Sequence, residues 1–228
     1  MRLAWFILAA CMGVVLQAVP ASAGLTYTLN CSVNPCSGAS AANNYGTVEL
    51  TTGAAGHVVV SVTLAANEKF ADLSSGYAIL WTIAGDPNVT IAPLGSTASD
   101  FAVQNGGNAG HYLANPFGNN PNNCNGSNAV SCFDYAIAHK NGAATDTSLI
   151  FDVTQSGGLV LTDFAANSEG FSFAAKILQT GNGTAFYVAS NGTPVPEPQT
   201  WTLCLAGLAG LTGLAAWRRR QKHSAKPR

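Results

Sequence analysis

The chain has 228 residues, of which only 9% are charged, and its formal net charge at pH 7 is −1. This total conceals an uneven distribution, because residues 24–193 carry ten acidic side chains, three lysines and no arginine, a net charge of −7. Nucleic-acid binding depends on the neutralisation of phosphates by lysine and arginine, so this composition excludes a nucleic-acid partner for that segment. An acidic, soluble, exported surface is the expectation.

Residues 1–23 have the pattern of a secretory signal peptide. Arg2 supplies a charged start, Leu3 to Val19 form the apolar region, and Ala21-Ser22-Ala23 provide the small residues that signal peptidase accepts. The mature chain would then begin at Gly24. A lipobox-like alternative, Leu8-Ala9-Ala10-Cys11, would divide the apolar region, so we expect signal peptidase to cleave after Ala23 instead.

Residues 24–193 are long enough for one domain with its own core, and their periodicity is that of β-strands. Apolar residues alternate with polar ones, as in Val58, Val60 and Val62 against Ser61 and Thr63. The segments expected to be strands are Leu25–Asn30, Tyr45–Thr51, Val58–Leu64, Gly76–Ala84, Asn88–Ala92, Ser99–Gln104, Cys132–His139, Leu149–Thr154, Gly158–Phe164, Phe171–Ile177 and Thr184–Ser190. The sequence therefore predicts an all-β fold, an antiparallel β-sandwich of jelly-roll type.

Four cysteines fall in this domain: Cys31, Cys36, Cys124 and Cys132. An even number in an oxidising compartment indicates disulfides, although four cysteines allow three connectivities. We favour the local pairs Cys31–Cys36 and Cys124–Cys132, each of which closes a short turn-rich segment. A zinc site is the alternative, but neither spacing matches the usual Cys-x2-Cys pair, and we expect no metal and no cofactor.

One segment interrupts the strand pattern. Residues 104–128 are rich in Asn and Gly and predict a long exposed loop, which could bind a glycan or calcium or could be a flexible insertion. The segment contains no Asp or Glu, which disfavours calcium. We therefore expect a tethered insertion.

No catalytic motif is evident: Gly-x-Ser-x-Gly, His-Glu-x-x-His and the phosphate-binding Gly-rich loop are all missing from the sequence. The domain's histidines are scattered and expected at the surface: His57, His111 and His139. A pair of carboxylates for glycoside hydrolysis could be drawn from Asp134, Asp152 and Asp163. Any acidic β-domain offers such pairs, so we expect a protein without enzymatic activity.

The last part of the chain, residues 194–228, has three consecutive features. A Pro-rich stretch (194–200) contains Val195-Pro196-Glu197-Pro198, and the uncharged apolar run 201–217 follows it. As a helix, this run is about 25 Å long, near the lower limit for a transmembrane helix. The tail 218–228 begins with Arg218-Arg219-Arg220 and is expected to stay in the cytoplasm by the positive-inside rule. The fold class thus includes a signal peptide helix and a C-terminal transmembrane helix at the two ends.

These three features in this order resemble the PEP-CTERM sorting signal, also described as an ice-binding-protein C-terminal motif, of exported proteins in Gram-negative bacteria. The resemblance implies processing by an exosortase, a membrane thiol transpeptidase that would recognise Pro196-Glu197-Pro198 and cut nearby. The expected partners are therefore signal peptidase, the exosortase and, transiently, the membrane. Ice binding itself would need a flat array of regularly spaced threonines, which the sequence does not show.

The sequence predicts a protein exported across the inner membrane, anchored as a precursor, and then released to the cell surface or the extracellular space. The resemblance implies association with exopolysaccharide in a surface or matrix role. One alternative is a carbohydrate-binding module, which would need exposed aromatics such as Tyr112, Phe117 or Tyr135. The other alternative is a secreted hydrolase.

Overall fold

The structure is a computed structural model that describes residues 24–33, 43–71, 76–115, 117, 132–140, 146–181, 183–191 and 194–196. Nearly all of them belong to one compact unit, Gly24–Val195. The predicted signal peptide helix (1–23), transmembrane helix (201–217) and basic tail lie outside the described residues. Within those residues, no helix has the length and apolarity to cross a membrane.

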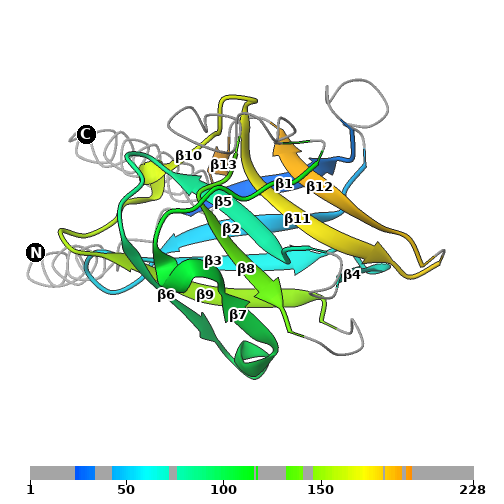
Figure 1. Cartoon of the computed structure of the whole chain (residues 1–228), viewed down its shortest axis with the longest axis horizontal. Coiled ribbons are helices and arrows are strands. Elements are labelled where there is room, and N and C mark those ends of the chain that lie inside the picture. Colours follow the sequence, from blue (N-terminus) through cyan, green and yellow to red (C-terminus); the bar gives the residue numbers. More distant parts are fainter. Residues whose placement is uncertain are drawn as a thin grey trace, which may run out of the picture. The chain divides into compact units, whose positions relative to one another are not determined.

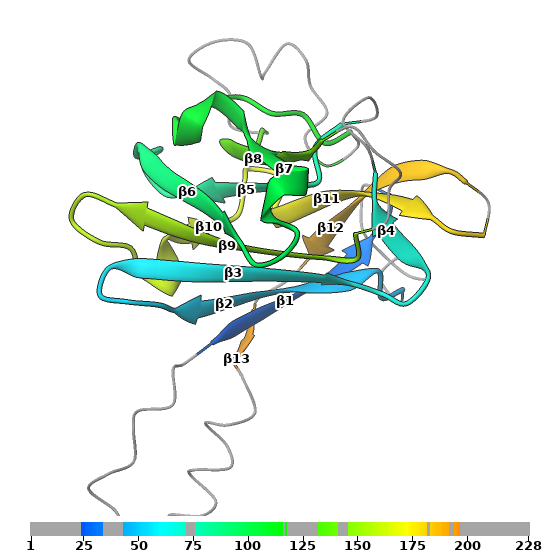
Figure 2. The ribbon, with the colours of Figure 1, turned by 90° about the horizontal axis from the view of Figure 1, so that it is seen from below.

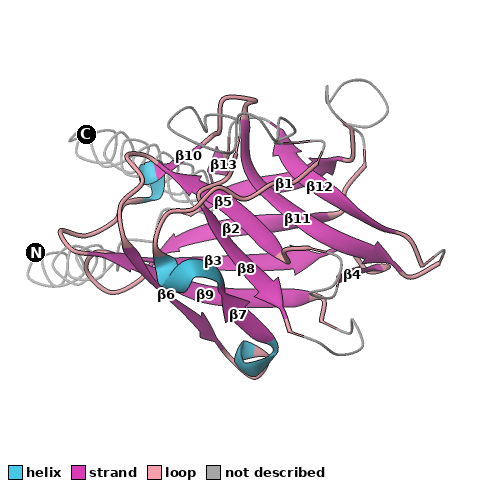
Figure 3. Cartoon of the chain, viewed as in Figure 1, coloured by secondary structure: helices cyan, strands magenta, loops and turns pink. Residues whose placement is uncertain are grey.

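The regular elements in the described part of the unit are strands and short 3-10 helices, joined by turns and loops (Figures 1 and 3). The strands of the first half are β1 (Leu25–Cys31), β2 (Gly46–Thr52), β3 (His57–Leu64), β4 (Glu68–Phe70), β5 (Ile79–Ile83), β6 (Val89–Leu94) and β7 (Phe101–Val103). Those of the second half are β8 (Tyr135–His139), β9 (Ser148–Gln155), β10 (Phe164–Ala165), β11 (Phe171–Gln179), β12 (Ala185–Asn191) and β13 (Val195–Pro196). The 3-10 helices are η3 (Ala98–Asp100), η4 (Gln104–Gly107) and η5 (Leu161–Asp163).

The strands form one continuous antiparallel sheet in the order β6-β9-β3-β2-β1-β12-β11-β5-β8-β7. The sheet curves back on itself, so that β1, β2 and β3 form one layer and β5, β7 and β8 lie in the opposite layer (Figure 2). The all-β antiparallel prediction is confirmed. The two layers resemble a sandwich, but they belong to a single sheet rather than to the two separate sheets of a jelly roll.

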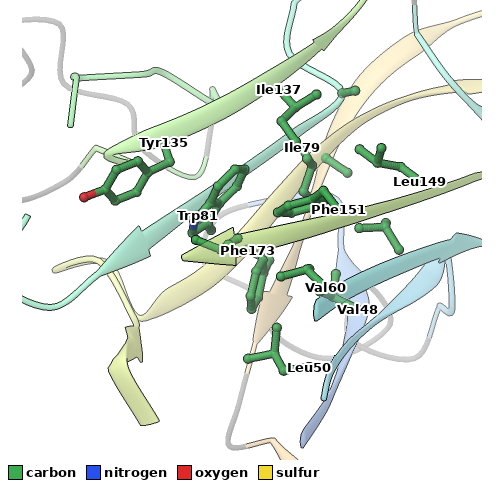
Figure 4. Packing of buried hydrophobic residues seen from close by; sticks show 14 of the residues in the cluster. Val48, Leu50, Val60, Ile79, Trp81, Tyr135, Ile137, Leu149, Phe151 and Phe173 are labelled. Atoms are coloured by element: carbon green, nitrogen blue, oxygen red, sulfur yellow. The ribbon is translucent and has the colours of Figure 1, made fainter. Parts of the chain in front are cut away.

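The core between the layers follows from the alternation of each strand. In β3, Val58, Val60 and Val62 are fully buried while Ser61 and Thr63 point outward, as expected for a sheet with one dry face. Large rings fill the space between the layers: Trp81 lies 5.8 Å from Tyr135 and 4.9 Å from Phe151, measured between ring centroids (Figure 4). Such offset and tilted aromatic pairs add to the free energy of burial.

A second, smaller apolar cluster covers the other side of β11, β12, β5 and β8. Its buried members are Cys31, Leu80, Ala114, Phe117, Phe133, Ala136, Phe171, Ala174 and Ala189. Phe117 and Phe171 are in edge-to-face contact at 4.9 Å. These strands are therefore buried on both faces, which explains the run of five buried residues at the start of β11.

One predicted strand is wrong. Residues 158–164 were expected to form a strand, but this segment is an irregular turn followed by η5, and only Phe164 enters a strand. Gly157 and Gly158 both adopt positive φ, which breaks the extended backbone, and the Asp163 carboxylate accepts a hydrogen bond of 2.8 Å from the Val160 N–H. The short strand β4 was not predicted, because three residues carry too little periodicity.

Candidate functional site

Three tyrosines gather on the outer side of the sheet and form what we call the tyrosine patch: Tyr77, Tyr112 and Tyr187. Tyr77 precedes β5, Tyr112 belongs to the segment before β8, and Tyr187 lies in β12. All three are half-buried and pack against the second apolar cluster. Tyr187 is directed to this side because its neighbour Val188 points into the main core.

Specific contacts fix the geometry of the patch. The Tyr77 and Tyr112 rings meet edge to face, with centroids 5.1 Å apart. The Tyr187 hydroxyl accepts a hydrogen bond of 3.2 Å from the Tyr77 N–H. Lys176, opposite Tyr187 in the register of β11 and β12, places its Nζ 5.0 Å from the Tyr187 ring centroid.

Two glycines make room for the rings. A Cβ at Gly110 would lie 2.8 to 3.0 Å from atoms of the Tyr112 ring, so any side chain there would displace that ring. At Gly76, whose φ is +137°, a Cβ would overlap the Tyr187 hydroxyl. The close approach of these two backbone segments therefore holds Tyr112 and Tyr187 in place.

The hydroxyls of Tyr112 and Tyr187 stay protonated at neutral pH, because their pKa values are raised. Burial raises the pKa of Tyr112, and the nearby Tyr77 hydroxyl raises it further. Burial also raises the pKa of Tyr187, an effect partly offset by its hydrogen bond with the Tyr77 backbone. In the described part of the chain, the Tyr112 hydroxyl has no hydrogen-bond partner of its own, so it can both donate to and accept from a ligand.

The prediction of an exposed glycan contact is wrong for two of the three aromatic residues named. Phe117 is fully buried in the second cluster, and Tyr135 is 1% exposed in the main core. The Tyr135 hydroxyl donates to the Pro87 carbonyl, which anchors the turn before β6. Only Tyr112 is accessible, and the sequence did not indicate its neighbours Tyr77 and Tyr187.

The segment 104–128 was predicted to be a long exposed loop, and its described part, 104–115 and Phe117, is instead held against the domain. Tyr112 forms an antiparallel bridge with Phe133, and Asn167 Nδ2 donates a 3.1 Å hydrogen bond to the Phe117 carbonyl. These contacts are long-range and leave no sequence pattern, which is why they were missed. Residues 118–128 lie outside the described residues.

Two histidines pair with carboxylates, and one of them, His57, lies at the surface with a 40% exposed side chain. His57 Nδ1 is 2.8 Å from Asp152 Oδ2 on the outer face of β3 and β9, and His139 Nε2 is 2.7 Å from Asp146 Oδ2. The surface prediction is wrong for His139, which is 2% exposed, and right for His111, which is exposed. In the described ranges neither paired histidine is hydrogen-bonded to a serine, threonine or cysteine, so neither pair has the nucleophile of a triad.

Among the described residues, Asp134 is the carboxyl group whose pKa is raised furthest. Its burial raises its pKa to about 7, and the nearby Asp86 carboxylate contributes through charge repulsion. Asp86 itself sits in an exposed turn with a positive φ of 49°. The carboxylates suggested for glycoside hydrolysis therefore have separate surroundings: Asp134 beside Asp86, Asp152 beside His57, and Asp163 on the Val160 N–H.

A row of hydroxyl groups crosses the outer face of the other layer. Thr28, Thr47, Thr63 and Ser148 are direct neighbours in the registers of β1, β2, β3 and β9. The sequence could not reveal this row because it depends on strand pairing. It spans four strands of a twisting sheet and is no extended flat array. No group of three or more metal-ligating side chains occurs among the residues that the structure describes.

Comparison with known families decides the nature of the C-terminal segment. Residues 194–220 match the PEP-CTERM protein-sorting motif. The match confirms the resemblance seen in Pro196-Glu197-Pro198 and the features that follow it. No curated protein and no solved structure matches the chain.

The PEP-CTERM motif supports an exported protein that is targeted to an exosortase in a Gram-negative bacterium and sorted through a membrane-anchored form. In the structure the motif begins at the end of the β-domain: Val195 belongs to β13, which pairs with β1. Glu197, Pro198 and the cluster Arg218 to Arg220 lie outside the described residues.

The remaining predicted processing and disulfide positions are only partly described. Gly24, the expected first residue of the mature chain, is buried directly before β1, and Ala21 and Ala23 lie outside the described residues. Cys31 and Cys132 are buried, at 0% and 2% exposure. Their expected partners, Cys36 and Cys124, are not among the described residues, so both pairings stay predictions.

Proposed function

We propose that this protein is an exosortase-processed component of the cell surface or extracellular matrix that associates with exopolysaccharide and has no enzymatic activity. The observation that carries the proposal is the PEP-CTERM motif, which follows directly after a compact β-domain and supports the role of that domain as the exported cargo. After cleavage near Pro196-Glu197-Pro198, the domain would leave the membrane without its apolar segment.

Intact-mass analysis of the exported protein tests the processing. We expect Gly24 at the N-terminus and loss of the segment 201–217. Glu197→Ala should leave a membrane-anchored precursor whose chain still ends at Arg228. Glu169 is an exposed glutamate within the domain, so Glu169→Ala should be processed normally. A mature wild-type protein that still ends at Arg228 would reduce the C-terminal segment to a simple anchor.

The absence of activity is supported by two observations on the described residues: Asp134, Asp152 and Asp163 have different partners rather than one another, and no serine, threonine or cysteine is hydrogen-bonded to His57 or His139. A panel of glycosidase and esterase substrates tests it on the exported protein. Turnover that is abolished by Asp134→Asn or Asp152→Asn would identify a secreted hydrolase instead.

A carbohydrate-binding module is the second candidate, and the tyrosine patch is the observation that favours it. Aromatic rings that carry hydroxyl groups combine apolar contact area with hydrogen bonding, which suits a ligand that has both. Tight binding to one defined glycan on an array would favour such a module over a general matrix role.

A further inference from the structure

We propose that Tyr77, Tyr112 and Tyr187 form the surface on which the protein holds a polysaccharide chain, with sugar rings stacked on the tyrosines. This inference rests on the polysaccharide association proposed above and adds the site of contact. It is carried by the convergence of three half-buried tyrosines from separate parts of the chain.

The chemistry of the patch matches that of a sugar ring. One face of a pyranose presents C–H groups, which pack favourably against an aromatic ring, and its rim carries hydroxyls that donate and accept hydrogen bonds. Each tyrosine offers both an apolar ring and a hydroxyl, and burial raises the pKa of Tyr112 and Tyr187, which keeps those two hydroxyls protonated. Three such side chains together can contact more than one sugar unit.

The rings are also fixed before a ligand arrives. Gly110 packs against the Tyr112 ring, Tyr112 packs edge to face on Tyr77, and the Tyr77 N–H donates to the Tyr187 hydroxyl. Each contact removes rotational freedom that a ligand would otherwise have to remove on binding. A tyrosine also has few rotatable bonds to immobilise, which suits a preformed binding surface.

The charge around the patch disfavours an anionic ligand. The patch lies on the outer side of β12, beside the segment that carries Tyr112, and the one cation in direct contact with its described residues is Lys176. Polyanions bind through clusters of basic residues, and a domain of net charge −7 offers none. Many copies of the domain displayed together would bind a repeating polysaccharide with avidity, although each aromatic site alone is weak.

The test uses the full chain, purified in detergent, and native gel electrophoresis through gels that contain either the exopolysaccharide of the producing bacterium or dextran as a neutral reference. We expect Tyr112→Ala and Tyr187→Ala each to raise the apparent Kd for the exopolysaccharide, obtained from the retardation, about tenfold, as for the loss of one stacked ring. Gly110→Ala should raise this Kd as well, because it displaces the Tyr112 ring without removing it. Tyr45→Ala is the matched control, since Tyr45 is also half-buried but packs on Phe186 outside the patch.

The outcomes separate this inference from the proposed function. Retardation of the wild-type chain that all three patch variants retain would overturn the tyrosine patch as the site and leave the polysaccharide association in place. No retardation of the wild-type chain by the exopolysaccharide would overturn both. Equal weakening by Tyr45→Ala, with thermal midpoints unchanged in all variants, would likewise show that the patch has no special role.

Discussion

His139 Nε2 lies 2.7 Å from Asp146 Oδ2, which joins the last residue of β8 to a carboxylate that begins the next described segment. The histidine is 2% exposed, and its Nδ1 is buried with no hydrogen-bond partner among the described residues. Asp146 also accepts a 2.9 Å hydrogen bond through its carbonyl from the Phe70 N–H of β4. The pair therefore links β8, β4 and the segment that leads into β9.

Removal of the carboxylate should destabilise the domain. Asp146→Ala leaves both ring nitrogens of a buried histidine unpaired, which costs about 1–3 kcal/mol of unfolding free energy. Asp146→Asn keeps an acceptor at the same place and should cost clearly less. Guanidinium denaturation of the two variants measures the difference. Equal losses would mean that the hydrogen bond to His139 contributes nothing.

The raised pKa of Asp134 should make stability depend on pH. In the unfolded chain Asp134 ionises at about pH 3.9, whereas its folded pKa is raised to about 7. Between these values the folded state holds a proton that the unfolded state has released, so stability should fall as pH rises from about 4 to about 7 and then level off. The slope for one proton is at most about 1.4 kcal/mol per pH unit.

Urea denaturation at pH 5 and pH 8 measures this effect. Asp134→Asn should flatten the dependence, because the amide does not titrate. Glu49→Gln, which removes a half-exposed carboxylate from the outer face of β2, is the control and should leave the slope intact. The same slope in Asp134→Asn and wild type would assign the pH dependence to other groups.

The elements that could be predicted from sequence are those whose burial alternates. The sequence predicts β3 and β9 because buried and more exposed residues alternate along each of them. Their predicted boundaries are within one residue of the observed ones. The tyrosine patch could not be predicted, because Tyr77 and Tyr187 meet only through the pairing of β11 with β12 and β5. Similarly, the burial of Phe117 depends on its contact with Phe171, far along the chain.

Gly107 lies where the two terminal strands of the sheet, β6 and β7, come close together: it belongs to η4, which follows β7, and it packs against Val89 of β6. Its φ is +86°, and a Cβ there would overlap the Val89 carbonyl of β6. Gly106, with φ +61°, has open space around its Cβ position and is a matched control. Gly106→Ala should cost about 1–2 kcal/mol through its left-handed backbone alone, and Gly107→Ala should exceed it by about 2 kcal/mol through steric overlap. Thermal denaturation checks this, and similar midpoints for the two variants would contradict it.

The local disulfide pairing of the four cysteines in the domain can be tested directly. Nonreducing peptide mapping of the exported protein should join Cys31 to Cys36 and Cys124 to Cys132. Because Cys31 and Cys132 are buried, reduction should become efficient only after partial unfolding. A peptide that joins Cys31 to Cys132, or four free thiols, would show that the local pairing is wrong.

The central position of β1 sets the order in which this domain can fold. β1 is the first strand to leave the export channel, yet it pairs on one side with β2 and on the other with β12, where Leu29 lies opposite Ser190. A chain halted before Ala185 would present two open strand edges, on β1 and on β11, and would be prone to aggregate. Because such distant strands pair slowly, the sheet is completed only when nearly the whole cargo has emerged, just as the sorting motif reaches the membrane.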